Sequence, residues 1–213
     1  MCLQAQFFLK REAILLGRNP LYMGMPLCFA YIILILCSCI PGIEWSKSLP
    51  YLSLLAFVLA HWLSLEMLFQ DDFKQQVWLI WKSNDLDFRP VLYSKIGLHY
   101  FGVGGGLLLG LGFFQILNGV DTKILSFFLL ALFVASAIFS LFASFVVALL
   151  LGLPKKNGWI GILLLPFYIP ILIFTALCLE EPEFIWGLVG TFLLLVLVLP
   201  GLTYKTLEYN LGS

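Results

Sequence analysis

The sequence predicts an all-α membrane protein that crosses a lipid bilayer as six helices. Of its 213 residues, 62% are hydrophobic and only 11% are charged, whereas a soluble domain carries roughly a quarter charged residues. The apolar residues lie in long runs, and six of these runs have about the 20 residues that a spanning helix needs. None of them alternates apolar and polar residues as barrel strands do, and the backbone must satisfy its hydrogen bonds inside the hydrocarbon, so the runs are expected to be helices.

A single membrane domain over residues 1–213 is expected, without a linker that would divide it. The expected spans are residues 21–40, 50–69, 91–117, 124–153, 158–179 and 184–202. Residues 1–18 mix large apolar side chains with Lys10 and Arg11, which predicts a helix lying along the membrane surface, although Arg11 falls on its apolar side. A polar loop, 70–90, follows the second span.

Basic residues predict the orientation. Six spans place both termini, the second loop and the fourth loop on one side of the membrane. Ten of the 12 basic residues fall on that side, and the other side has only Lys47 and Lys123. Since basic residues gather on the cytoplasmic side, we expect both termini to be cytoplasmic in a bacterial inner membrane, or on the matrix side of a mitochondrial one. The net charge of zero, without a basic arm, argues against a nucleic-acid partner.

Two charged residues lie within expected spans. Glu66 is near the end of the second span and Lys95 is near the start of the third. The short loop between these spans brings the two ends together, so an intramembrane ion pair is plausible. The alternative, equally open, is that each side chain reaches the membrane surface separately.

The expected spans also contain the chain's two histidines, His61 and His99. Two histidines on different spans could ligate a haem iron, but no haem-attachment or metal motif accompanies them, and the five cysteines match none either. We therefore favour packing or interfacial hydrogen bonding for the histidines. No nucleophile and base are placed together, so the chain is expected to be non-enzymatic, without a catalytic residue, bound cofactor or metal site.

Small residues recur every four positions on two expected spans. Gly102, Gly106 and Gly110 form two overlapping GxxxG steps on the third span, and three serines, Ser136, Ser140 and Ser144, repeat that spacing on the fourth. Such faces let another helix backbone approach closely. The pattern does not decide whether that helix belongs to the same chain or to a second copy.

Pro166 and Pro170 lie inside the fifth expected span. Each proline removes a backbone hydrogen bond and crowds the preceding turn. The pair predicts a kink that could act as a hinge, although a static distortion is the favoured interpretation.

The loop at 70–90 combines acidic residues with large aromatic ones. Asp71 and Asp72 suit the first turn of a helix, while Trp78 and Trp81 expose more apolar area than a free loop should. We expect this segment to dock on a protein partner, with the lipid headgroup layer as the alternative.

Two stretches resemble the haem exporter protein B family. They are LSLEMLFQDDF at 63–73, followed by VLYSK at 91–95, and GLPKKNG at 152–158, running into LPFYIPILIF at 165–174. Together these cover about a third of the chain. After Asp72 the family commonly has Asp-Gly-Ser-Leu-Glu-Gln, whereas this chain has QQVWLI at 75–80.

The resemblance implies an exporter-type (ABC-2) permease that works with a separate ABC ATPase. Its other expected partners are the haem-handling membrane proteins C and D and the haem chaperone E of c-type cytochrome biogenesis. By resemblance, ATP binds the partner, haem is the transported or partner-held ligand, and the segment around Phe69 and Asp72 is a cytoplasmic coupling helix that docks on the ATPase. Two alternatives remain: a permease that exports a lipid, polysaccharide or drug, and a non-transporting assembly scaffold.

Overall fold

A computed structural model describes residues 10–11, 14, 21–41, 44–65, 89–150 and 156–212. Along these segments the elements are α2 (Leu21–Ser38), α3 (Trp45–Leu65), α6 (Arg89–His99), the π-helix η1 (Tyr100–Gly104), α7 (Gly105–Leu117), α8 (Thr122–Leu149), α9 (Lys156–Glu180), the 3₁₀ helix η2 (Pro182–Phe184) and α10 (Ile185–Gly212). No strand occurs in these segments. The prediction of an all-α membrane protein is confirmed.

Within the described residues, five helices are long and apolar enough to cross a membrane. They are Lys47–Leu65, Arg89–Leu117, Thr122–Leu149, Trp159–Glu180 and Pro182–Asn210. Helix α2 is also strongly apolar, and its part Gly24–Ser38 forms a shorter apolar helix. A multi-pass architecture is therefore established, while the number of six spans stays a prediction.

Two helices extend five or more residues beyond the apolar runs that predicted them. Helix α3 begins at Trp45, five residues before Pro50, so Pro50 lies inside the helix, where it cannot donate a hydrogen bond to the carbonyl of Ser46. Helix α10 continues to Gly212, ten residues beyond the last expected apolar residue. Its final turns carry polar side chains and need not lie in hydrocarbon.

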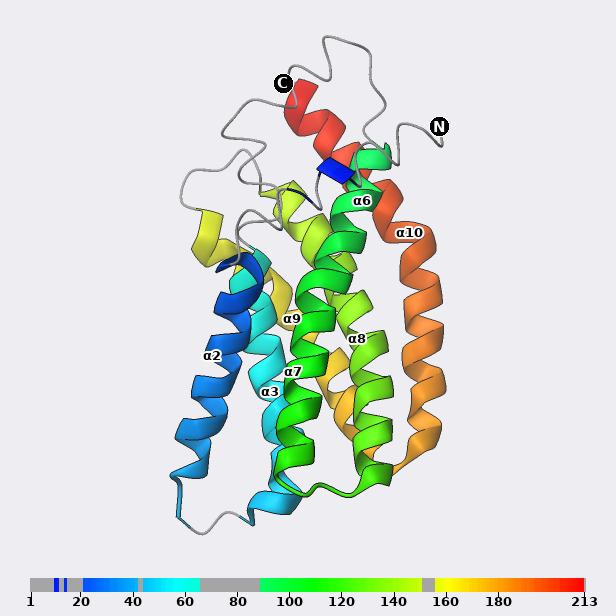
Figure 1. Ribbon diagram of the computed structural model, residues 1–213. Coiled ribbons are helices and arrows are strands. Elements are labelled where there is room, and N and C mark those ends of the chain that lie inside the picture. The colour runs from blue at the N-terminus through cyan, green and yellow to red at the C-terminus, as the bar shows by residue number, and fades with distance from the viewer. Residues whose placement is uncertain are drawn as a thin grey trace.

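Helix α8 is the centre of the bundle. It packs against α10 and α9 and also contacts α7, α3 and α6, and it stands between α7 and α10 in Figure 1. Fifteen of its 28 residues are buried, among them alanines and serines. Small side chains allow neighbouring backbones to approach closely where apolar burial cannot hold helices together, as in lipid.

The bundle has two distinct ends (Figure 1). One end, the Arg89 end, holds the start of α6 and the ends of α3, α8 and α10. The other, the Glu180 end, holds the turns that follow α7 and α9. There the Tyr51 hydroxyl donates to Glu180 Oε1 at 3.1 Å, and Trp45 Nε1 donates to Asn118 Oδ1 at 3.2 Å.

Several expected features lie outside the described residues. Of the predicted surface helix at 1–18, only Lys10, Arg11 and Ile14 are described, and these are helical. The loop 70–90 is described only at its last two residues, which begin α6. Both features stay predictions.

Candidate functional site

Four helices meet at a polar cluster inside the apolar bundle. Its members come from α3, α6, α8 and α9, and we call them the histidine cluster: His61, Ser64, His99, Ser140 and Tyr168. All five side chains are buried, the most exposed being Tyr168 at 4%. Buried polar groups in hydrocarbon are costly unless they are hydrogen-bonded, so their partners decide what the cluster can do.

Two serine hydroxyls connect the two histidines. Ser140 Oγ lies 3.4 Å from His61 Nε2 and 3.2 Å from His99 Nδ1. Ser64 Oγ lies 2.9 Å from His99 Nε2 and donates to the His61 carbonyl at 2.6 Å. A serine hydroxyl is therefore the partner of His61 Nε2 and of both ring nitrogens of His99.

One set of protonation states satisfies this network. Because the Ser64 proton is given to the His61 carbonyl, its oxygen accepts from His99 Nε2–H. A neutral imidazole has one donor and one acceptor nitrogen, so His99 Nδ1 accepts from the Ser140 hydroxyl. Ser140 can then accept from His61 Nε2–H. The arrangement suits two neutral histidines, each with its proton on Nε2.

Tyr168 closes the network from α9. Its hydroxyl lies 3.4 Å from His61 Nδ1 and 3.2 Å from the Phe139 carbonyl. The Phe139 carbonyl oxygen and His61 Nδ1 are both hydrogen-bond acceptors in this set of protonation states. The single hydroxyl proton of Tyr168 is therefore shared between these two acceptors. Of the contacts in the network, the longest are the 3.4 Å contacts of His61 with Tyr168 and with Ser140.

The glycine-rich run explains how His99 reaches α8. Immediately after His99 the chain forms the π-helix η1, in which the Gly105 N–H bonds to the carbonyl of Tyr100, five residues back. Single π turns often occur at functional sites. At Gly104, a Cβ would lie only 3.3 Å from the Ser136 Cβ. The absence of that Cβ brings this span close to the serine face of α8, on which Ser140 lies one turn beyond Ser136.

The two prolines of α9 flank the tyrosine of the cluster. Pro166 and Pro170 both lie inside a helix that continues without interruption from Lys156 to Glu180. Neither proline can donate to the carbonyl four residues before it, so the backbone around Tyr168 has fewer hydrogen bonds than an ordinary helix. A hinge at these two prolines stays a prediction.

The geometry does not fit a haem between the histidines. A haem iron with two axial histidines lies between imidazoles on opposite faces of a flat macrocycle. Here the rings of His61 and His99 are in edge-to-face contact, with centroids 4.8 Å apart and planes at 85°. In the described residues, no group of three or more His, Cys, Asp and Glu side chains could hold a metal ion.

The glycine face of the third span is used in part within the chain. The Tyr31 hydroxyl of α2 donates to the Gly110 carbonyl at 2.9 Å, and a Cβ at Gly110 would overlap Leu27. Gly102 and Gly106 are partly exposed. The contact at Gly110 is thus internal, and a second copy at the rest of this face stays a prediction of the sequence alone.

The other predicted site residues lie mostly outside the described segments. Lys95 is on α6 and 8% exposed, but Glu66 is not described, so the ion pair stays a prediction. The predicted ATPase-docking residues, all in the undescribed segment, are Phe69, Asp71, Asp72, Trp78 and Trp81.

Sequence reasoning missed the serine and tyrosine partners of the histidines. Ser64 follows His61 by three residues, a spacing that places both on one helix face. Ser140 stood out only as a packing residue, and Tyr168 only as part of the stretch around the prolines. The preference for hydrogen bonding by the histidines agrees with the structure.

Comparisons with known proteins give a consistent result. The family model described as "CcmB protein" matches residues 4–207. A protein named heme exporter protein B from Pseudomonas aeruginosa is 32% identical over 169 residues, which cover 78% of this chain and 75% of that protein. A protein of the same name from Haemophilus influenzae is 27% identical over 179 residues, or 81% of this chain and 79% of that protein.

Proposed function

Because the chain belongs to the CcmB protein family, we propose that it is the membrane permease of an ATP-driven complex that exports or delivers haem for c-type cytochromes. The observation that carries the proposal is the family match over residues 4–207. The helices described above support it, since a permease must span the membrane several times.

The energy for transport would come from a separate protein. The sequence contains no GxxxxGK[ST] phosphate-binding motif, and an ABC ATPase is the partner that this family membership suggests. We propose that the ATPase docks on the segment from Phe69 to Trp81. The membrane proteins C and D and the haem chaperone E would then receive or release haem. In this proposal either haem itself crosses the permease, or ATP hydrolysis releases the haem-loaded chaperone.

We propose that the histidine cluster transmits force from that docking segment. Helices α3 and α6 lie on either side of residues 66–88 in the chain, and each of them carries one histidine of the cluster. His61 is four residues from the end of α3, and His99 ends α6. A pull on the docking segment would therefore act on two helices whose hydrogen bonds meet at Ser140 on the central helix α8.

Gene deletion with complementation tests the proposal. Deletion should abolish covalently bound haem in c-type cytochromes, and the wild-type gene should restore it, as measured by haem staining of membrane proteins. Intact c-type cytochromes after deletion would contradict the proposal and favour a permease for another substrate.

Charge reversal at Asp72 tests the coupling. Asp72→Lys should reduce co-purification of the ATPase because it reverses a charge in the proposed docking segment. Lys123→Glu, a reversal at the Glu180 end, is the matched control and should leave co-purification unchanged. Normal cytochrome yield with an ATPase that cannot hydrolyse ATP would instead indicate a scaffold.

A further inference from the structure

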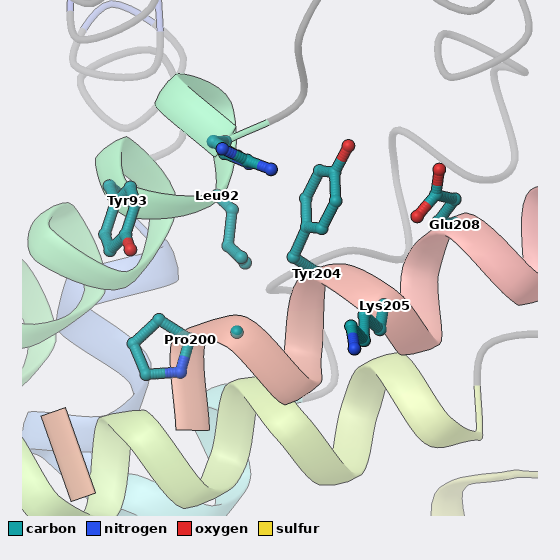
Figure 2. A pocket seen from close by; sticks show the side chains of 8 residues that line it. Leu92, Tyr93, Pro200, Tyr204, Lys205 and Glu208 are labelled. Carbon is teal, nitrogen blue, oxygen red and sulfur yellow. The ribbon is translucent and has the colours of Figure 1, made fainter. Parts of the chain in front are cut away.

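A second polar region lies between α6 and α10 at the Arg89 end. It is a pocket of about 440 Å³ lined by two basic, one acidic and two tyrosine side chains over an apolar floor. Leu92 and Tyr93 come from α6, and Pro200, Tyr204, Lys205 and Glu208 come from α10 (Figure 2). The volume falls within the range of small-ligand sites, and the proposed haem-export function does not account for it.

The depth of this α6–α10 pocket matches a lipid headgroup. Helix α10 starts at Ile185 at the Glu180 end. At about 1.5 Å per residue, Pro200 lies about 22 Å and Glu208 about 35 Å along it. A hydrocarbon core about 30 Å thick therefore ends within the height of the pocket. The apolar floor, with Leu92 and Pro200 buried, lies on the hydrocarbon side of that boundary.

The basic side chains of the pocket favour a negatively charged ligand. Two of the charged side chains that line it, Arg89 and Lys205, are basic, and one, Glu208, is acidic. The Arg89 guanidinium stacks over the Tyr204 ring, 4.9 Å from its centroid, which holds the guanidinium at the pocket wall. A phosphodiester carries one negative charge and accepts hydrogen bonds from cations and from tyrosine hydroxyls.

The surroundings of the pocket favour a lipid as the source of that phosphodiester. Helix α10 is at the edge of the bundle, with only 22% of its apolar span buried, and Tyr93 and Tyr209 are 59% and 76% exposed. Tyrosines at this depth are typical of the membrane interface. Basic pockets between spanning helices on the cytoplasmic side commonly hold anionic lipid headgroups.

We propose that the α6–α10 pocket binds the phosphodiester headgroup of an anionic phospholipid from the leaflet at the Arg89 end. Lys205 and Arg89 hold the phosphate, and the lipid's acyl chains leave along the exposed apolar side of α10. Glu208, on the same helix as Lys205, weakens the attraction of the lining for anions.

Native mass spectrometry of the full-length protein, titrated with phosphatidylglycerol in detergent, tests the proposal. Lys205→Gln should weaken binding about fivefold, because one basic residue near the membrane surface contributes about that factor. Glu208→Gln should tighten binding, since it removes the negative charge from the lining. Lys123→Gln, an exposed lysine at the Glu180 end, is the control and should bind as the wild type does.

Four results would overturn the proposal. Equal losses for Lys205→Gln and Lys123→Gln would mean that the lipid only follows general surface charge. Weaker binding by Glu208→Gln would have the wrong sign. Displacement of the lipid by millimolar inorganic phosphate, or equal binding of phosphatidylethanolamine, would exclude an anionic lipid as the ligand. Glu208→Gln keeps the test decisive if Lys205→Gln fails to fold, and the elution volume of each variant checks folding.

Discussion

The histidine cluster and the α6–α10 pocket both place polar side chains in an apolar bundle, but they satisfy those side chains in opposite ways. In the cluster, five side chains no more than 4% exposed find partners among themselves and in nearby carbonyls. In the pocket, Arg89, Lys205 and Glu208 are exposed at the end of the bundle. A neutral network can therefore lie in hydrocarbon, whereas the formal charges of the pocket lie where water or headgroups can reach them.

This difference implies different roles. The cluster holds four helices at one point, so its loss should affect stability and the transmission of movement. The exposed charged side chains of the pocket contribute little to packing, so their loss should affect ligand binding. The following changes separate the two regions, from the largest expected effect on stability to the smallest.

Ser140→Ala should have the largest effect. It removes the hydroxyl that contacts both imidazole rings and leaves two buried nitrogens without that partner. We expect a loss of about 1–3 kcal/mol in the free energy of unfolding, measured by SDS titration in mixed micelles. Ser126→Ala on the same helix, where the serine is exposed, is the control and should change stability by less than about 0.5 kcal/mol. Equal effects of the two changes would mean that the cluster does not hold the helices together.

Tyr168→Phe should have a smaller effect of the same kind. The tyrosine contacts to His61 Nδ1 and the Phe139 carbonyl are long, so their removal should cost about 0.6 kcal/mol, the average for hydrogen bonds inside membranes. Combining it with Ser140→Ala should give a non-additive result, because His61 contacts both residues. Strict additivity in SDS titration would argue against one connected network.

Lys205→Gln should leave the free energy of unfolding within about 0.5 kcal/mol of wild type in lipid-free detergent, since the Lys205 side chain is exposed. Added phosphatidylglycerol should then stabilise the wild type more than the variant, as binding to the folded state does. A large loss of stability without lipid would show that the lysine supports the fold itself, and the contrast with the cluster would disappear.

Much of the fold followed from the sequence because membrane insertion depends on properties that are local along the chain. Runs such as 124–153 predicted a helix that the structure places at Thr122–Leu149, since about 20 apolar residues in hydrocarbon leave the backbone few alternatives. The prolines of α9 and the glycines of the third span could also be recognised from the sequence, because their effects on a helix are local along the chain. Their consequences differed in detail: α9 continues through both prolines, and the glycine run contains a π-helix.

The candidate site could be predicted only in part. His61 and His99 stood out because histidines are rare in apolar spans, but they are 38 residues apart on different helices. Ser140, on a third helix, has no mark in the sequence that distinguishes it from Ser136 or Ser144. Which of the three serines faces the histidines depends on the rotation of α8 about its axis and on the extra residue in the π turn.

The sequence alone determined that this protein is a helical membrane protein that belongs with haem exporter B proteins, because composition and short motifs can be read along the chain without its fold. Only the tertiary structure decided that two histidines share a serine and that Arg89 stacks on Tyr204. Such contacts join side chains from separate helices. Because lipid tails are as apolar as the helix surfaces, the pattern of apolar residues does not show which helix faces pack together. Close packing and hydrogen-bond geometry determine them, and these exist only in the assembled bundle.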